Sequence, residues 1–425
     1  MPKVVISIAF LFFLGHALKW FFIRTKVPDL LILVCIGYLI GPILGLISQE
    51  DLGKVGGFLS IVALVVILYE GGLGLKGKDL LQSTLPAAGL SLVGFFLICG
   101  VTIFFTWLFA GHGWTTAILL GLAVGSTSSA VVIPMVKHLS ISEKTKTILS
   151  LESAFTDVLA IVLFLVAVDS VSSGSFSAQK LLEGIGPATL LSIIYGLSAG
   201  ILWAWLRNKF PELSAMAFAS ESWALLVYGL VEISRYNGAM AVLALGFSLA
   251  NLNLLPGWAK KFINPEAVSL AEQSLLAEIT LLIKTLFFIY LGILVSFDSL
   301  PIVALALLIA VMIFVTRWLA IRLLFNPKQY NRKEAMICMA MGPRGLACAV
   351  LATIPLQRGL ENGLWIQNTL FALIPISILF TAAFVFVGEN KKIRGKLYRL
   401  FPAFRDREEL EAATFEGNDE TTLAT

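Results

Sequence analysis

The chain is poor in charged residues. Only 14% of its 425 residues are Asp, Glu, Lys or Arg, whereas 58% are hydrophobic and the mean hydropathy is +0.90. A soluble domain carries about 25% charged residues, so this composition excludes an ordinary soluble protein. The net charge of +4 is small, and the basic residues lie in short connections instead of one patch. A nucleic-acid partner is therefore not expected.

Cysteine and histidine are scarce as well. The four cysteines lie in apolar segments without paired spacing, which argues against a disulfide framework or a zinc site. The three histidines are scattered, which argues against a histidine metal cluster. No nucleophile, base and orienting group can be recognised together, so we expect neither an enzyme nor a bound cofactor. The first apolar run, Val4–Ile23, lacks a small-residue cleavage site and is not expected to be a signal peptide.

Long apolar runs dominate the chain. By the criterion of roughly 17–25 residues per crossing, we identify about thirteen windows that are long enough to span a bilayer. The sequence therefore predicts an all-α polytopic membrane protein. The windows are 4–23, 30–48, 55–73, 85–110, 114–136, 148–169, 187–206, 214–233, 238–256, 270–297, 300–325, 334–357 and 366–388.

The basic residues alternate between the two sides of the predicted bundle. Because positive residues accumulate in cytoplasmic connections, the N-terminus is expected outside and the C-terminus inside. The acidic, polar segment 406–425 is expected to be disordered. The inner connections carry Arg24, Lys26, Lys76, Lys78, Lys137, Lys144, Lys146, Arg207, Lys209, Lys260, Lys261, Lys328, Arg332 and Lys333, and the outer ones carry Lys54, Lys180, Arg235 and Arg358.

Two carboxylates interrupt the sixth window. Glu152 and Asp157 lie within SLESAFTDVLAIVLFLVAV, and a charged side chain near the bilayer centre costs roughly 2.5–3.5 kcal/mol. Five residues apart, they differ by roughly 140° around a helix and face different neighbours. We expect Glu152 to pair with a buried arginine, for which Arg317 and Arg344 qualify, and Asp157 to meet a mobile ion. A purely structural carboxylate at Asp157 is the alternative.

Two windows contain residues that are unfavourable inside a helix. The fifth holds Gly125-Ser-Thr-Ser-Ser129 and Pro134, and the twelfth holds Gly342-Pro-Arg-Gly345 and Pro355. Broken helices at matching positions of two halves are typical of secondary transporters. The two windows lie an odd number of spans apart, so their surroundings would run in opposite directions and form an inverted repeat. The hydroxyl residues could instead bond to nearby carbonyls or allow close helix packing.

Other polar residues of the apolar windows have less distinctive surroundings. Glu70, at the end of the third window, is a candidate for lining an ion pathway. Glu278 and Lys284 of the tenth window are expected to form a local pair, or the lysine to extend towards the interface. The segment from Gly37 to Pro42 is expected to pack closely against another helix and to end its own.

The segment LESAFTDVLAIV resembles the signature of the electroneutral monovalent cation/proton antiporters of the sodium/proton exchanger type. The resemblance also covers GYLIGPILGL, the hydroxyl run of the fifth window, Arg317 and the Gly-Pro-Arg-Gly of the twelfth window, and it excludes the tail. It implies an antiporter without cofactor that exchanges Na⁺, or alternatively K⁺, for protons. It also implies a homodimer in a prokaryotic plasma (inner) membrane.

The resemblance assigns particular residues to the site. It implies that Asp157, Ser153 and the Thr127 carbonyl hold the transported Na⁺ or K⁺, that Glu152 pairs with Arg317, and that Arg344 lies at the helix crossing. Two positions depart from the family pattern: Thr156 replaces an asparagine, and Ser128 replaces an acidic residue that many relatives carry. We keep both as site candidates.

The resemblance further implies a core that moves like an elevator against a scaffold. The scaffold or dimerisation helices would be 1–84, the first core segment 85–170, the linker helix and further scaffold 171–299, the second core segment 300–388, and the short cytoplasmic tail 389–425. A single aspartate in the signature is typical of exchange of one ion for one proton. A sodium-coupled organic-anion symporter of similar architecture is the alternative. A channel is disfavoured, because no filter-like repeat or charged ring is present.

Overall fold

The computed structural model describes residues 2–25, 28–47, 49–74, 85–172, 187–216, 218–257, 263, 270–295, 297, 299–390 and 393–405. The predicted tail 406–425 lies outside these residues, as do Lys26, Lys76, Lys78, Lys180, Lys260 and Lys261 of the connections. The described elements are helices, with a π-helical turn η1 and a 3₁₀ turn η2. They are α1 (Pro2–Thr25), α2 (Asp29–Tyr38), η1 (Leu39–Ile43), α3 (Gln49–Gly74), α5 (Leu85–Ala110), α6 (Trp114–Val124), α7 (Ser129–Lys137), α8 (Glu143–Ser172), α10 (Pro187–Lys209), α11 (Pro211–Ala215), α12 (Ala219–Ile233), α13 (Gly238–Ala250), η2 (Leu252–Leu254), α15 (Leu270–Leu294), α16 (Leu300–Leu324), α17 (Arg332–Ala340), α18 (Leu346–Gln357), α19 (Gly363–Glu389) and α20 (Gly395–Tyr398).

The all-α prediction is confirmed, and each predicted apolar window overlaps a helix. Among the described residues, seven helical segments are long and apolar enough to cross a membrane, judged by length and composition. Five further apolar helices are shorter. The seven long segments are Ala87–Ala110, Trp114–Lys137, Glu143–Ser172, Leu190–Lys209, Glu272–Leu294, Leu300–Leu324 and Gly363–Glu389.

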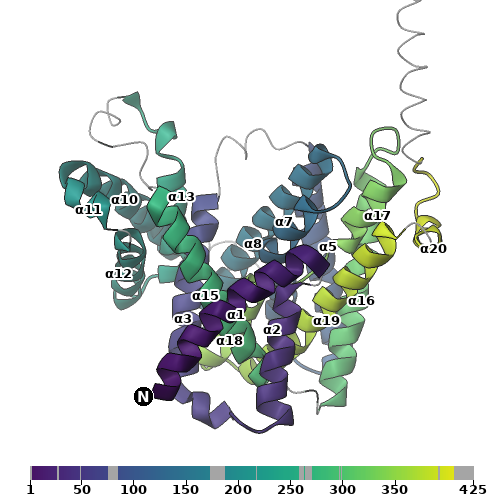
Figure 1. Cartoon of the computed structure of the whole chain (residues 1–425), viewed down its shortest axis with the longest axis horizontal. Coiled ribbons are helices and arrows are strands. Elements are labelled where there is room, and N and C mark those ends of the chain that lie inside the picture. The colour runs from purple at the N-terminus through teal and green to yellow at the C-terminus, as the bar shows by residue number, and fades with distance from the viewer. Residues whose placement is uncertain are drawn as a thin grey trace, which may run out of the picture.

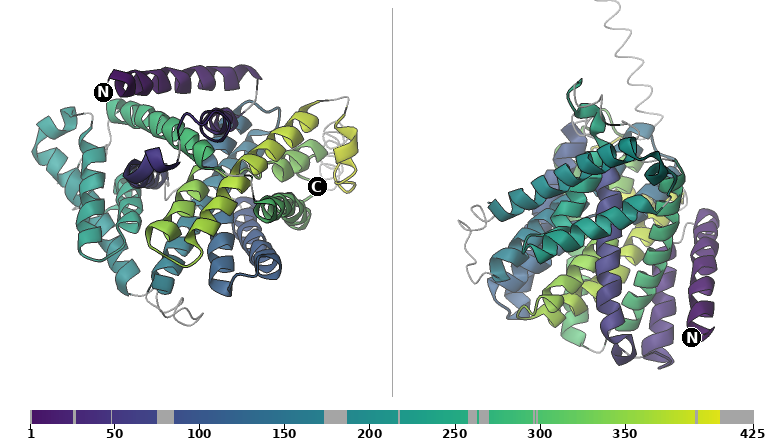
Figure 2. Two further views of the ribbon diagram at one scale, coloured as in Figure 1. Left: turned by 90° about the horizontal axis from the view of Figure 1, so that it is seen from below. Right: turned by 90° about the vertical axis from the view of Figure 1, so that its left-hand side faces the viewer.

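The helices form two packing groups; in Figure 1, α10–α13 of the first lie on the left, and α16, α17 and α19 of the second lie on the right. In the flanking group, defined as α1–α3 and α10–α15, α13 packs on α3, α10 and α12, and α15 packs on α2 and α3. In the crossing group, defined as α5–α8 and α16–α19, α5 packs on α6, α8 and α16, and α19 packs on α16, α17 and α18. Helix α1 lies along the outer edge of the flanking group (Figure 2).

Small residues let two helices of the flanking group approach closely. A Cβ added at Gly37 of α2 would lie 2.1 Å from the Ile289 carbonyl oxygen, and one added at Gly292 of α15 would lie 2.3 Å from the Val34 carbonyl oxygen. The two backbones therefore touch, as small residues permit in membrane bundles. The predicted close packing around Gly37 is thus present, and the helix continues into the π-helical turn η1 that contains Pro42.

Both predicted breaks are present in the crossing group. The backbone leaves the helix between α6 and α7 at residues 125–128, and between α17 and α18 at residues 341–345. Pro134 and Pro355 lie inside α7 and α18 and do not cause the breaks. Each proline removes one backbone donor from a short helix, and the helix continues around it.

Residues 393–405 dock on the crossing group after the last long helix. Trp318 Nε1 of α16 donates to the Leu400 carbonyl at 3.0 Å, and Arg332 Nε at the start of α17 donates to the Phe404 carbonyl at 2.9 Å. The aromatic side chains of Phe401 and Phe404 are buried there, with ring centroids 5.7 Å apart. This segment is therefore attached to α16 and α17.

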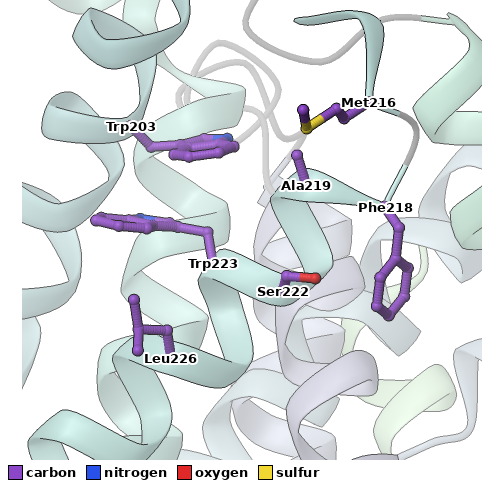
Figure 3. A pocket seen from close by; sticks show the side chains of 7 residues that line it. All are labelled: Trp203, Met216, Phe218, Ala219, Ser222, Trp223 and Leu226. Atoms are coloured by element: carbon purple, nitrogen blue, oxygen red, sulfur yellow. The ribbon is translucent and has the colours of Figure 1, made fainter. Parts of the chain in front are cut away.

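A shallow apolar groove of about 410 Å³ lies on the flanking group, between α10 and α12 (Figure 3). The rings of Trp203 and Trp223 stack along it, with centroids 5.1 Å apart. Met216, Phe218 and Leu226 complete the apolar lining, and its lining residues are all uncharged. The groove therefore presents mainly aromatic and aliphatic side chains.

Candidate functional site

The two backbone breaks meet inside the crossing group. The Ser128 backbone N–H donates to the Pro343 carbonyl at 2.9 Å, which joins the first break to the second. A Cβ added at Gly345 would lie 1.9 Å from Ser128 Oγ. Non-helical backbone survives at membrane depth only where protein or a cavity surrounds it, and here each break provides a hydrogen-bond partner for the other.

Asp157 of α8 points at the start of α7. Its Oδ2 accepts a hydrogen bond from the Ser129 hydroxyl at 2.7 Å and a longer one from the Ser129 backbone N–H at 3.3 Å. Ser129 is the first residue of α7, so its N–H has no partner within the helix. A carboxylate is favourable at a helix N-terminus, where free N–H groups carry partial positive charge. The break therefore creates the polar partner that a carboxylate needs in an apolar bundle.

The second carboxylate oxygen of Asp157 makes no hydrogen bond of normal geometry to the described residues. Asp157 Oδ1 and Ser128 Oγ are both buried without a hydrogen-bond partner among the described residues. Both residues line the same cavity of about 490 Å³. Buried polar oxygens are rarely left without a partner, and carboxylate and hydroxyl oxygens are suitable ligands for a hard cation.

The cavity lies between the crossing group and the flanking group. Its lining includes Asp157, Ser128 and Ser129 from the crossing group, and Glu70 of α3 and Lys284 of α15 from the flanking group. The sequence candidates Asp157, Ser128 and Glu70 are thus brought together. The described residues that line the cavity do not include the other candidates, Ser153, Thr127 and Thr156.

Ser153, Thr127 and Thr156 bond to other parts of the protein. The buried Ser153 hydroxyl donates to the Ser150 carbonyl of its own helix at 3.0 Å. The Thr127 backbone N–H donates to Thr156 Oγ1 at 3.0 Å and thereby ties the first break to α8. Thr156 therefore makes a polar contact to the first break.

Arg344 lies in the second break and is 1% exposed. Its Nη1 donates to Thr127 Oγ1 at 3.1 Å, and its backbone N–H donates to Ser377 Oγ at 2.9 Å. Arg344 follows the end of α17, and Thr127 follows the end of α6. A positive charge is favourable near a helix C-terminus, and a negative charge near a helix N-terminus. The charges at the crossing follow this rule: Arg344 lies near the C-terminal ends of α17 and α6, and Asp157 lies at the N-terminal end of α7.

Glu152 and Arg317 form a buried ion pair. Arg317 Nη2 donates to Glu152 Oε2 at 2.9 Å, and Nη1 donates to Oε1. Arg317 also donates from Nε and Nη2 to the Cys338 carbonyl, at 3.1 and 2.8 Å. That carbonyl belongs to the last turn of α17, where helix carbonyls lack helical partners. The Arg317 guanidinium of α16 therefore links this helix to α8 and α17.

Sequence reasoning missed Ser129 as the hydrogen-bond partner of Asp157. Four consecutive hydroxyl residues, Ser126 to Ser129, lie where the helix restarts, and their composition does not distinguish them. The sequence does not show at which residue α7 begins. That residue matters because the N–H and hydroxyl of the first helical residue, Ser129, bond to the Asp157 carboxylate.

Gly345 offers a stability test of the crossing. Replacing Gly345 by alanine is expected to lower the free energy of unfolding by about 1–3 kcal/mol, because the new Cβ would overlap Ser128 Oγ. The thermal unfolding midpoint of the purified protein measures this change. The matched control is Gly100→Ala in α5, where an added Cβ has open space. Equal midpoints for the two variants would contradict the close contact at the crossing.

The long apolar helices and the two broken helices that meet at a buried aspartate are the features of a secondary transport protein of the membrane. The chain belongs to the sodium/hydrogen exchanger family: the model described as "Sodium/hydrogen exchanger, transmembrane" matches residues 6–388. The predicted family resemblance is therefore confirmed.

The proteins to which the chain is similar include two bacterial antiporters. It is 25% identical over 373 residues to the K(+)/H(+) antiporter NhaP of Alkalimonas amylolytica, covering 84% of this chain and 61% of that protein. It is 28% identical over 378 residues to the K(+)/H(+) antiporter NhaP2 of Shewanella sp. (strain ANA-3). This alignment covers 85% of this chain and 62% of that protein. The chain thus spans about three fifths of the length of these relatives.

The sodium proton antiporter MjNhaP1 of Methanocaldococcus jannaschii has the same fold. Its structure matches with a TM-score of 0.72 at 20% sequence identity, covering 92% of this chain and 98% of that chain. At this identity the similarity shows the fold alone.

Proposed function

We propose that the protein is a secondary active antiporter that exchanges a monovalent cation for protons across the membrane. The observation that carries this proposal is Asp157, a residue that lines the cavity. Ser129 holds one of its carboxylate oxygens, and the other is buried without a hydrogen-bond partner among the described residues. The membership of the sodium/hydrogen exchanger family supports it. Residues 4–388 would cross the membrane thirteen times, as the apolar windows predict.

Competition for one carboxylate is sufficient for coupled exchange. A proton or a cation neutralises Asp157, and the neutral site can cross a dry barrier. The empty, ionised carboxylate is expensive to move, because desolvating a bare charge costs several kcal/mol. Asp157 and Ser128 would hold the cation directly, with Ser153, Thr156 and the Thr127 carbonyl as further proposed ligands. With one titrating aspartate, the exchange would be electroneutral, one ion for one proton.

The moving part would be the crossing group. Its helices are joined by the contact between the breaks and by the link of Glu152, Arg317 and the Cys338 carbonyl. The cavity lies between this group and the helices α3 and α15, and both sides contribute residues to its lining. We propose that it moves like an elevator against the flanking group, which would also form the homodimer interface.

The proposed location is a prokaryotic plasma (inner) membrane, with the N-terminus outside and the C-terminus in the cytoplasm. The basic residues of the predicted inner connections support this orientation. In this orientation Asp29, at the start of α2, and Gly74, at the end of α3, lie towards the cytoplasm. Both line the cavity, so the site would be accessible from the cytoplasm in this conformation.

Proton movement in proteoliposomes tests the function and identifies the ion. Vesicles with an acidic interior receive Na⁺, K⁺ or Li⁺ in turn, and a pH-sensitive dye reports the internal pH. We expect Na⁺ to dissipate the gradient, with K⁺ as the rival substrate. Dissipation by one cation that disappears in Asp157→Asn supports antiport. A folded protein that responds to none of them would overturn the proposal and point to uptake of an organic anion with sodium.

A further inference from the structure

The cavity beside Asp157 contains a protein cation. Lys284 lies in the middle of α15 and lines the same cavity as Asp157 and Glu70. A lysine ammonium is a monovalent cation on a flexible four-carbon stem, so it resembles the proposed transported ion in charge. A tethered group has a high effective concentration at any site that it can reach.

The predicted local pair of Lys284 with Glu278 is wrong. Lys284 Nζ instead lies 3.0 Å from Asp29 Oδ2 of α2, and Glu278 Oε2 lies 3.0 Å from His16 Nε2 of α1. The Lys284 and Asp29 side chains are 13% and 17% exposed, so this ion pair is largely shielded from water. It therefore differs from a solvated surface pair, whose contribution is small.

Asp29 is held in place by the backbone. It is the first residue of α2, and its Oδ1 accepts from the Leu30 backbone N–H at 3.0 Å. Its Oδ2 is thereby directed to the lysine. Since Lys284 has four rotatable side-chain bonds, Asp29 is the fixed member of the pair and Lys284 the adjustable one.

We propose that Asp29 is a positioning residue that keeps the Lys284 ammonium away from the cavity carboxylates, so that the transported cation neutralises Asp157. This inference rests on the proposed antiport. Without Asp29, the ammonium would turn to Glu70 and Asp157, the other carboxylates that line the cavity among the described residues. It would then compete with the transported cation for them, because opposite charges attract strongly where water is partly excluded.

The test compares Asp29→Asn, Lys284→Gln and the double variant with wild type in proteoliposomes. Asparagine retains an oxygen for the Leu30 N–H and removes the charge that holds Lys284. We expect Asp29→Asn to raise the apparent KM for the cation about tenfold, equivalent to about 1.4 kcal/mol, with little change in the maximal rate. Adding Lys284→Gln should restore the KM to within about twofold of wild type, because the competitor is then absent.

A merely structural ion pair gives the opposite pattern. If the pair only joined α2 to α15, the double variant would be no better than Asp29→Asn, and the thermal unfolding midpoint would fall in both. Lys19→Gln in the Asp29→Asn background is the matched control, because Lys19 is a second lysine that lines the cavity. Restoration by Lys19→Gln to the same extent as by Lys284→Gln would overturn the assignment to Lys284.

Failure of this inference can be told apart from failure of the proposed function. If wild-type protein moves no protons with any cation, the antiport itself is refuted and the inference falls with it. If wild type exchanges and Asp29→Asn has the wild-type KM, the antiport stands and the role of Asp29 is refuted.

Discussion

Replacing Asp157 by asparagine is expected to abolish cation-driven proton movement while the protein still folds and inserts. Asparagine has nearly the same volume and retains an oxygen that can accept from the Ser129 hydroxyl, which lies 2.7 Å from Oδ2. The amide does not ionise, so it cannot bind a proton and a cation in alternation. We expect the rate of internal pH change to fall to that of protein-free vesicles.

Glu143→Gln is the matched control for this variant. It removes a carboxylate from the same helix, at an exposed position whose side chain is 87% accessible. Its exchange rate should remain that of wild type. Exchange by folded Asp157→Asn at the wild-type rate would end the single-carboxylate mechanism, since another group would then have to carry the proton.

The second large effect is expected from the ion pair of Glu152 and Arg317. Changing either residue alone to glutamine leaves the partner buried and charged, since the side chains are 2% and 6% exposed. Such a loss costs about 3–5 kcal/mol of stability. The double variant Glu152→Gln/Arg317→Gln should be more stable than either single variant, because no uncompensated charge remains. Thermal unfolding of the purified proteins measures the three differences.

The exposed pair of Glu143 and Lys146 provides the comparison. Its charged atoms are 2.8 Å apart, and Glu143→Gln should cost only about 0–1 kcal/mol, because the Glu143 side chain is 87% exposed and already solvated. Equal loss of stability at the exposed and the buried pair would show that burial of Glu152 and Arg317 is not the cause.

The helices and their breaks could be predicted because they depend on local sequence. Apolar runs of membrane length correspond to helices, and a carboxylate inside such a run is costly enough to mark Asp157. The Gly-Ser and Gly-Pro runs mark the breaks, although Pro134 and Pro355 were not needed for them. Composition indicates where a helix is unstable. The contacts between the two breaks determine which residues are not helical.

The hydrogen-bond and ion-pair partners of the polar side chains could not be predicted from the local sequence. Thr127 and Ser128 are neighbours in sequence, yet Thr127 bonds to Arg344 and Ser128 lines the cavity with Asp157. Asp29 and Lys284 are 255 positions apart, and nothing local identifies either as the partner of the other. Side-chain direction in a break and contacts between distant helices are products of tertiary packing.

The docked segment 393–405 provides a place from which motion can be followed. Because it is attached to α16 and α17, a fluorophore at the exposed Arg399 would travel with them. A second fluorophore at the exposed Glu212 of α11 would remain with the flanking group. Of the four cysteines, Cys35 alone is exposed, so one replacement prepares the chain for thiol labelling at both positions. If the crossing group moves as proposed, energy transfer between the two dyes would record each half-cycle of a single molecule in real time.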